Sequence, residues 1–280
     1  ALKDFGGIAG LTWKGEGEGS FAIAGPYSRV AIDGTLAMRD FDLDDFAVGV
    51  VQGRFGFAEG VLSFPGVTGQ KGRTVFHGDV ALDFGAEKAS VDAQLTVPDG
   101  RLEDVVEILA PLHRGVAAFR KRLTGRAEGG VWFQGPFETF GGEVRLALRD
   151  TDLLGRRLGD GELELRFVDG DAMVLEPLVL KGPLGRTHAE GTWSMDTGSL
   201  DYRFRGEGWR LEELMGMADA GPEGLKATLS MSGKVFGTTK LPKVTAWMQS
   251  PDVVLARQSL GPLLLEAQLI KRYRPPYNVL

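Results

Sequence analysis

Apolar and polar residues alternate in short runs along most of the chain. In one run, Val144, Leu146 and Leu148 are separated by Arg145 and Ala147. Successive side chains of a β-strand point to opposite faces of a sheet, so each run predicts a strand with one apolar and one polar face. Roughly fifteen such runs follow one another at the 8–12-residue spacing that is typical of all-β proteins.

Turn-forming residues separate these runs. The chain has 41 glycines in 280 residues, about twice the usual frequency of about 7%. Asp169-Gly170 and Gly159-Asp160-Gly161 are examples of the joins that we interpret as turns, and short joins of this kind favour antiparallel hairpins. The sequence therefore predicts a mainly β protein in which consecutive strands pair antiparallel.

Two segments have helical instead of alternating spacing. Residues 101–123 carry apolar residues at helical intervals, with Asp99 as the expected N-cap and Pro111 as a break. Residues 209–217 form a shorter version of the same pattern. We expect both segments to be short helical insertions outside the sheet.

The chain also repeats itself at a period of about 110 residues. Gly25-Pro26 recurs as Gly135-Pro136, and Glu59-Gly60 recurs in kind as Asp169-Gly170, both after 110 residues. Three further matches keep the same order, and they join 39–43 to 149–153, 72–74 to 185–187, and 101–104 to 210–213. We interpret the chain as one continuous array with approximate repeats at 20–123, 124–220 and 224–280. The third copy is incomplete, so we expect the chain to be an internal piece of a longer protein.

A long sheet with one apolar face has to remove that face from water. An open twisted sheet rarely exceeds about ten strands without curling or splitting. Two packed sheets, a closed barrel, or one long sheet curled along its length would each satisfy this requirement. In all three, strand parity predicts that one set of side chains shares a face, and this set comprises Ile32, Leu36, Met38, Phe55, Phe57, Val80, Leu82, Phe84, Val144, Leu146, Leu148, Leu163, Leu165, Phe167, Trp193, Met195, Tyr202, Phe204, Leu229 and Met231.

Composition narrows the possible functions. The formal net charge of −6 disfavours a nucleic-acid partner. The chain contains no cysteine, which excludes disulfides and thiolate chemistry. No run approaches the roughly 18 apolar residues of a membrane span, and the first residues do not have the pattern of a signal peptide.

A recurring order of strands and turns along the chain resembles that of a known protein family. In the second copy the order is 130–136, ending in Gly-Pro, then a strand over 143–153, a Leu158-Gly159 turn, a strand over 161–170, and a leucine-rich to glycine-rich stretch over 175–191. This order, with a helical insert followed by Leu123-Thr124-Gly125 and a new strand, resembles the AsmA-like/TamB family of repetitive β-groove proteins. The resemblance extends over nearly the whole chain.

The resemblance implies a long curled antiparallel sheet, or β-taco, whose apolar groove binds lipid. It also implies a periplasmic location, with an inner-membrane anchor in another part of the parent chain. The implied partners are phospholipid acyl chains and an outer-membrane β-barrel of the assembly module. The implied role is to conduct phospholipid between the two membranes, to support outer-membrane biogenesis, or both.

Other residue patterns resemble binding sites but have ordinary structural interpretations. The three histidines, His77, His113 and His188, lack further ligands nearby in sequence, so we interpret them as strand residues without a metal. The stretch 40–45 begins like a calcium loop, but Asp45 stands where the loop needs glycine, which favours a solvated turn. Gly15, Gly17 and Gly19 alternate with carboxylates that would repel a phosphate, and we interpret this stretch as a flexible connection.

One basic cluster offers a contact for anionic lipid head groups. It consists of Arg114, Arg120, Lys121, Arg122 and Arg126. The alternative interpretation is a solvated helix face, and the pattern favours that alternative.

Three functions are considered for a protein with this sequence pattern. The first is a lipid-conducting groove, and the second is a structural or adhesive β-solenoid with a closed, dry core and no ligand. The third is a carbohydrate-active enzyme, which needs two carboxylates facing each other in a cleft. The acids here are scattered over turns and alternate strand positions, so we expect neither an enzyme nor a cofactor, and we favour the groove.

Overall fold

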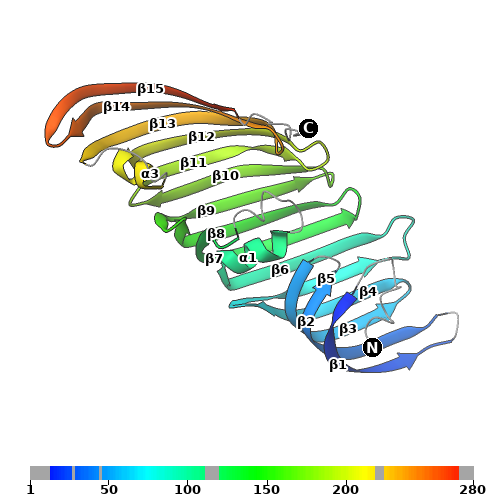
Figure 1. Cartoon of the computed structure of the whole chain (residues 1–280). Coiled ribbons are helices and arrows are strands. Elements are labelled where there is room, and N and C mark those ends of the chain that lie inside the picture. The colour runs from blue at the N-terminus through cyan, green and yellow to red at the C-terminus, as the bar shows by residue number, and fades with distance from the viewer. Residues whose placement is uncertain (1–12, 27–28, 44–45, 111–119, 218–223, 271–280) are drawn as a thin grey trace, which may run out of the picture. The chain divides into compact units, whose positions relative to one another are not determined.

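The computed structural model of this chain describes residues 13–26, 29–43, 46–110, 120–217 and 224–270. Within these residues, strands make up most of the structure and two short helices interrupt them (Figure 1). The elements are β1 (Trp13–Ala24), β2 (Ala31–Leu43), β3 (Phe46–Ala58), β4 (Val61–Lys71), β5 (Thr74–Asp83), β6 (Ser90–Arg101), α1 (Leu102–Leu109), β7 (Leu123–Pro136), β8 (Gly141–Leu153), β9 (Arg156–Val168), β10 (Ala172–Gly182), β11 (Gly185–Ser194), β12 (Ser199–Arg210), α3 (Leu211–Met217), β13 (Leu225–Thr238), β14 (Pro242–Leu255) and β15 (Gln258–Ile270).

The strands follow one another across a 15-stranded sheet in their sequence order. Neighbours pair antiparallel, from β1 with β2 to β14 with β15. Because β1 and β15 stand at the two ends of this order, the sheet is not closed into a barrel. The predicted fold class, a mainly β antiparallel sheet with short helical insertions, is confirmed.

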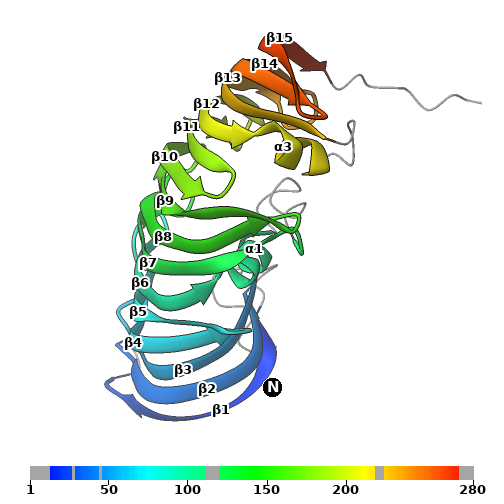
Figure 2. The ribbon, with the colours of Figure 1, turned by 90° about the vertical axis from the view of Figure 1, so that its left-hand side faces the viewer.

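Contacts within the chain divide it into two compact units, which we describe separately. The first unit is Ala1–Thr151 with Phe167–Gly170, and the second is Asp152–Arg166 with Asp171–Leu280. In the first unit the strands are strongly curved along their length, and α1 lies on the inner side of the curve (Figure 2).

The order of elements recurs along the chain. Six strands and a helix, β1 to α1, are followed by six strands and a helix, β7 to α3, and then by β13, β14 and β15. Unusual backbone angles recur at the same places, since Asp40 and Asp150 both have a positive φ, 49° and 52°. Glu59 and Asp169 do so as well, at 52° and 53°. The boundaries that we assigned to the copies from sequence stay a prediction.

The predicted turns are partly correct. Asp169-Gly170 joins β9 to β10 with φ angles of 53° and 67°, which suit a tight hairpin. Gly159-Asp160-Gly161 and the Leu158-Gly159 turn were wrong, because these residues lie inside β9. The glycines there permit close strand approach, as a Cβ on Gly161 would lie 1.7 Å from the Val179 carbonyl oxygen.

Two other loop predictions were also wrong. Gly15, Gly17 and Gly19 lie within β1 and are not a flexible connection. A Cβ on Gly17 would lie 2.4 Å from the carbonyl oxygen of Ala37 on β2, so the close pairing of these strands depends on glycine. Residues 40–43, interpreted as a solvated turn, instead continue β2, while Asp44 and Asp45 lie outside the described residues.

The first helix starts later than the sequence predicted. Asp99 belongs to β6, and the N-cap of α1 is Arg101, which has no side-chain cap of its own. A neighbouring strand supplies the missing interaction, because the Arg101 amide donates to Thr74 Oγ1 at 2.8 Å. Asp104 Oδ2 completes the junction by accepting from the Arg73 amide, the Thr74 amide and Thr74 Oγ1 at 2.9, 3.0 and 2.9 Å.

The helical insertions are shorter than predicted. Helix α1 ends at Leu109, and residues 120–122 form a turn in which Lys121 has a φ of 61°. Pro111 lies outside the described residues. Trp209 and Arg210, expected in the second helix, end strand β12 instead, and α3 begins at Leu211.

Each unit has a buried apolar cluster at the strand ends near its helix. In the first unit, Met38, Phe41, Val51 and Val67 are buried together, and the apolar side of α1 is buried as well through Leu102, Val106 and Ala110. In the second unit the cluster contains Leu184, Trp209, Ala227, Leu229 and Val253, with Leu211 and Leu214 of α3 packed against it. The helices therefore cover one end of the strands.

Thr74 should be important for the α1 junction, because its side chain is 1% exposed and makes two hydrogen bonds. We expect Thr74→Val to lower the free energy of unfolding by about 1–3 kcal/mol, since two polar groups would lose their buried partner. Urea denaturation measures this change. Thr96→Val, at an exposed position of β6, is the control and should stay within about 0.5 kcal/mol of the parent protein. Equal stabilities for the two variants would contradict the assignment.

Candidate functional site

In the first unit, strand register places apolar residues side by side on one face. Ile23 lies opposite Ile32, which lies opposite Phe57 on β3. The row continues through Leu62, Leu82 and Val91 on the next three strands. Directly opposed residues of an antiparallel pair project to the same face, so this row crosses six strands without a polar residue.

In the second unit, strand register also forms an apolar face, which consists of several neighbouring rows. Tyr202 lies opposite Gly191 on one side and Val235 on the other, and Val235 lies opposite Val244. In the adjacent row Phe204 lies opposite Ala189 and Gly233. Met231 lies opposite Met248 one row further along. We call this surface, in each unit, the apolar face.

All twenty side chains that the sequence assigned to one face lie on strands of this sheet or next to their ends. None of them is fully exposed, and their role in binding lipid stays a prediction. They are Ile32, Leu36 and Met38 on β2, Phe55 and Phe57 on β3, Val80 and Leu82 on β5 with Phe84 just beyond it, Val144, Leu146 and Leu148 on β8, Leu163, Leu165 and Phe167 on β9, Trp193 on β11 with Met195 just beyond it, Tyr202 and Phe204 on β12, and Leu229 and Met231 on β13.

Sequence reasoning left out whole strands of the apolar face. Leu62 and Phe64 on β4, Ala93 on β6 and Leu180 on β10 occupy it with the predicted residues. The signal was weak because bulges interrupt the alternation, as between Phe64 and Val67 and between Leu175 and Leu178.

Burial changes along the strands of the apolar face. Near the helices the side chains are shielded, and Met38 and Leu229 are 4% and 1% exposed. Toward the opposite strand ends Ile32, Phe57, Phe84 and Leu200 are only half-buried. Phe21 and Ile23 on the edge strand β1 are 58% and 64% exposed. Burial is not uniform at that end, because Leu82 and Trp193 are 7% and 6% exposed there, so the half-buried positions and the edge strand are the parts that a ligand can reach.

The other face of the sheet is polar and charged. Thr35 lies opposite Arg54, and Arg203 lies opposite Glu190 and Lys234. A hollow of about 910 Å³ lies on this side of β1–β4 in the first unit, and its lining includes Glu18, Ser20, Thr35, Gln52 and Arg54. Leu36, Ala37 and Pro65 also line this hollow, so its surface is mixed and not uniformly polar.

Tyr202 is the one residue of the apolar face that carries an acidic proton. Burial among apolar neighbours raises the pKa of its phenol from 10 to about 12, because the low-dielectric surroundings disfavour the phenolate. Val235 lies directly opposite it on β13.

The remaining sequence candidates are dispersed. His77 on β5 and His188 on β11 lie on the polar face, where they oppose Thr96 and Arg205. Arg126 forms an ion pair with Asp150, with 3.0 Å between Nη2 and Oδ2, and Arg120, Lys121 and Arg122 are exposed in the preceding turn, not on a helix. His113 and Arg114 lie outside the described residues. Among the residues that the structure describes, no group of three or more His, Asp or Glu side chains is arranged to hold a metal ion.

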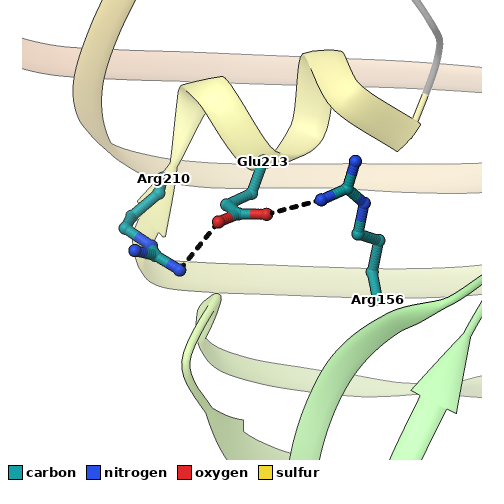
Figure 3. Close-up of polar contacts among 3 residues, drawn as sticks. All are labelled: Arg156, Arg210 and Glu213. Atoms are coloured by element: carbon teal, nitrogen blue, oxygen red, sulfur yellow. Dashed lines mark hydrogen bonds and ion pairs between the residues drawn. The ribbon is translucent and has the colours of Figure 1, made fainter.

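A charged cluster borders the buried core of the second unit. Glu213 of α3 lies between two arginines, with its Oε2 3.1 Å from Arg156 Nη1 and its Oε1 3.0 Å from Arg210 Nη2 (Figure 3). The guanidinium groups come from the start of β9 and the end of β12, and their side chains are 40% and 44% exposed. Sequence reasoning did not identify this cluster, because Arg156 lies 57 residues before Glu213 in the chain.

Comparison with known proteins gives little further guidance. No protein-family model matches the chain, and no solved structure matches it. A stretch of 41 residues is 51% identical to the UvrABC system protein C of Sphingopyxis alaskensis. That stretch covers 15% of this chain and 6% of the relative, so the chain spans only a small part of that protein's length. Within the described ranges, neither helix is long and apolar enough to cross a membrane.

The environment of Tyr202 predicts a pH effect on stability. Because the folded state holds its phenol neutral up to a pKa of about 12, the unfolded chain releases this proton first, from about pH 10 upward. The contribution of Tyr202 to the free energy of unfolding should therefore be fully present below pH 10 and be lost between pH 10 and 12. We expect Tyr202→Phe to lose less stability than the parent protein over this range, as measured by urea unfolding at each pH. Parallel losses in the two proteins would show that Tyr202 is not desolvated.

Proposed function

We propose that this chain is a non-enzymatic lipid-binding segment whose apolar face binds phospholipid acyl chains and conducts them along the sheet. The observation that carries the proposal is the apolar face itself, which register keeps free of charge across consecutive strands. An acyl chain needs no directional partner, so a continuous apolar surface suffices. Its binding would gain about 25 cal/mol for each Å² of apolar surface removed from water.

The gradient of burial favours this function over a structural solenoid with a dry core. In a dry core the large apolar side chains would be almost completely buried. Here Phe55, Phe57 and Phe204 in the middle or at the far end of the face are only half-buried. Leu82, Phe167 and Trp193 are buried as well, like the residues of the two clusters beside α1 and α3. The half-buried aromatic positions are the ones that support an accessible surface.

The resemblance to the AsmA-like/TamB family supports the wider setting of the proposal. In that setting the chain would lie in the periplasm, tethered by an inner-membrane anchor elsewhere in the parent protein. It would conduct phospholipid between the inner and outer membranes or support outer-membrane biogenesis with an outer-membrane β-barrel partner. The alternative function is the structural or adhesive β-solenoid without a ligand.

Two adjacent positions on β12 provide a direct test of lipid contact. Phe204 lies on the apolar face and Arg205 is exposed on the polar face. We expect a benzoylphenylalanine photocrosslinker at position 204 to form adducts with phospholipid in cell extracts, and the same group at position 205 to form few. Mass spectrometry of the irradiated protein measures both. Equal labelling, or none at position 204, would favour the structural solenoid.

A charge on the apolar face separates an accessible surface from a dry core. Leu165 is half-buried on β9, so the carboxylate of Leu165→Glu should stay hydrated when no lipid is bound, and cooperative unfolding should persist. Lipid binding should fall, because an acyl chain cannot solvate the ion. Ser230→Glu on the exposed polar face of β13 is the matched control and should bind lipid normally. Thermal unfolding and lipid binding are measured together, and loss of the fold in Leu165→Glu alone would identify a closed core.

A further inference from the structure

The cluster of Arg156, Arg210 and Glu213 has the composition of an anion site beside an apolar surface. Two guanidinium groups share a single carboxylate, and each keeps N–H donors that Glu213 does not use. Both arginine side chains are between a third and a half exposed, so an incoming ligand can reach them. Leu211 and Leu214 of the same helix pack into the buried cluster next to these charges.

Comparison of the two helix junctions shows that the fold does not require an arginine at the position of Arg156. In the first copy Asp104, the counterpart of Glu213, holds its junction through Thr74 and two backbone amides. The position of Arg156, the first residue of β9, is occupied by Phe46 at the start of β3 and by Gln258 at the start of β15. The second copy therefore carries Arg156 where the first copy has Phe46, whereas Arg101 stands at the counterpart of Arg210 and Glu107 of α1 pairs with Lys71, with 3.8 Å between Oε1 and Nζ.

We infer that Arg156 and Arg210 form a binding site for a phosphate ester, the head group of a phospholipid whose acyl chains lie on the apolar face. The arginine fork matches phosphate geometry, and charge-assisted hydrogen bonds of this type are strong. In the unliganded protein the Glu213 carboxylate occupies the place that the phosphate would take. This inference rests on the proposed lipid-binding function and assigns the residues that recognise the head group.

The phosphate site predicts that replacing an arginine and replacing Glu213 have opposite effects on phospholipid binding. Arg156→Gln or Arg210→Gln removes a ligand of the phosphate and should weaken binding of short-chain dihexanoyl phosphatidylglycerol about tenfold. Glu213→Gln removes the competing carboxylate and should leave this binding unchanged or tighter. If the cluster serves only to hold α3, all three substitutions should weaken binding together, because each breaks the same ion pairs.

Isothermal titration calorimetry of the whole chain with three ligands tests the inference. The ligands are dihexanoyl phosphatidylglycerol, dihexanoylglycerol, which lacks the phosphate, and glycerol phosphate, which lacks the acyl chains. We expect the parent protein to bind the phospholipid most tightly of the three ligands. In Arg156→Gln, the affinity for the phospholipid should no longer exceed the affinity for dihexanoylglycerol. The control is Arg203→Gln, which removes one exposed arginine from the polar face of β12 and should keep the higher affinity for the phospholipid. Hydrogen exchange of residues 211–217 shows in parallel whether α3 stays folded in each variant.

The three ligands also separate failure of this inference from failure of the proposed function. An unchanged preference for phospholipid in Arg156→Gln and Arg210→Gln, with α3 intact, would overturn the phosphate site and leave the apolar face as a lipid surface. If dihexanoylglycerol does not bind the parent protein at all, the proposed function itself fails. Tight binding of glycerol phosphate that Arg156→Gln abolishes would confirm the phosphate site and assign it to a soluble phosphate ester instead of a lipid.

Discussion

The antiparallel ladder is the constraint on which the rest of this structure depends. Each strand pairs with the next one in the sequence, so a residue's face is fixed by its parity in the ladder. Ile32, Phe57 and Leu62 share a face because they are directly opposed across β2, β3 and β4. A slip of one residue in a single strand would move its apolar side chains to the charged face, and register is therefore inseparable from the proposed function.

The helices solve a problem that the ladder creates. A single-layer sheet leaves its apolar side chains without a second layer, and α1 and α3 supply one locally at one end of the strands. Each helix is fastened by an acid near its start, but the fastenings differ. Asp104 binds the Thr74 hydroxyl and two amides, whereas Glu213 binds two arginines. The acid near the helix start therefore accepts hydrogen bonds from a neighbouring strand in the first copy and forms partly exposed ion pairs in the second.

Glycines allow the strands to pair closely, and the same glycines made strands difficult to distinguish from turns in the sequence. Gly17 and Gly161 lie where a Cβ would meet the carbonyl oxygen of the next strand, so they mark close pairing inside strands. In the sequence the same residues are indistinguishable from turn glycines such as Gly170, because both kinds interrupt the apolar alternation. For this reason the Leu158-Gly159 turn and the flexible connection at 15–19 were wrong, while the Asp169-Gly170 hairpin was correct.

Alternation with period two is a local property, so the class of fold and many of its strands could be predicted from the sequence. The sequence did not predict the bulges, the start of α1, or the distribution of burial over the apolar face. Those features depend on residues that are distant in sequence. The Thr74 hydroxyl accepts a hydrogen bond from the Arg101 amide, and α3 places Glu213 between Arg156 and Arg210. Only tertiary structure decided them, because no local pattern records which strand end a helix will cover.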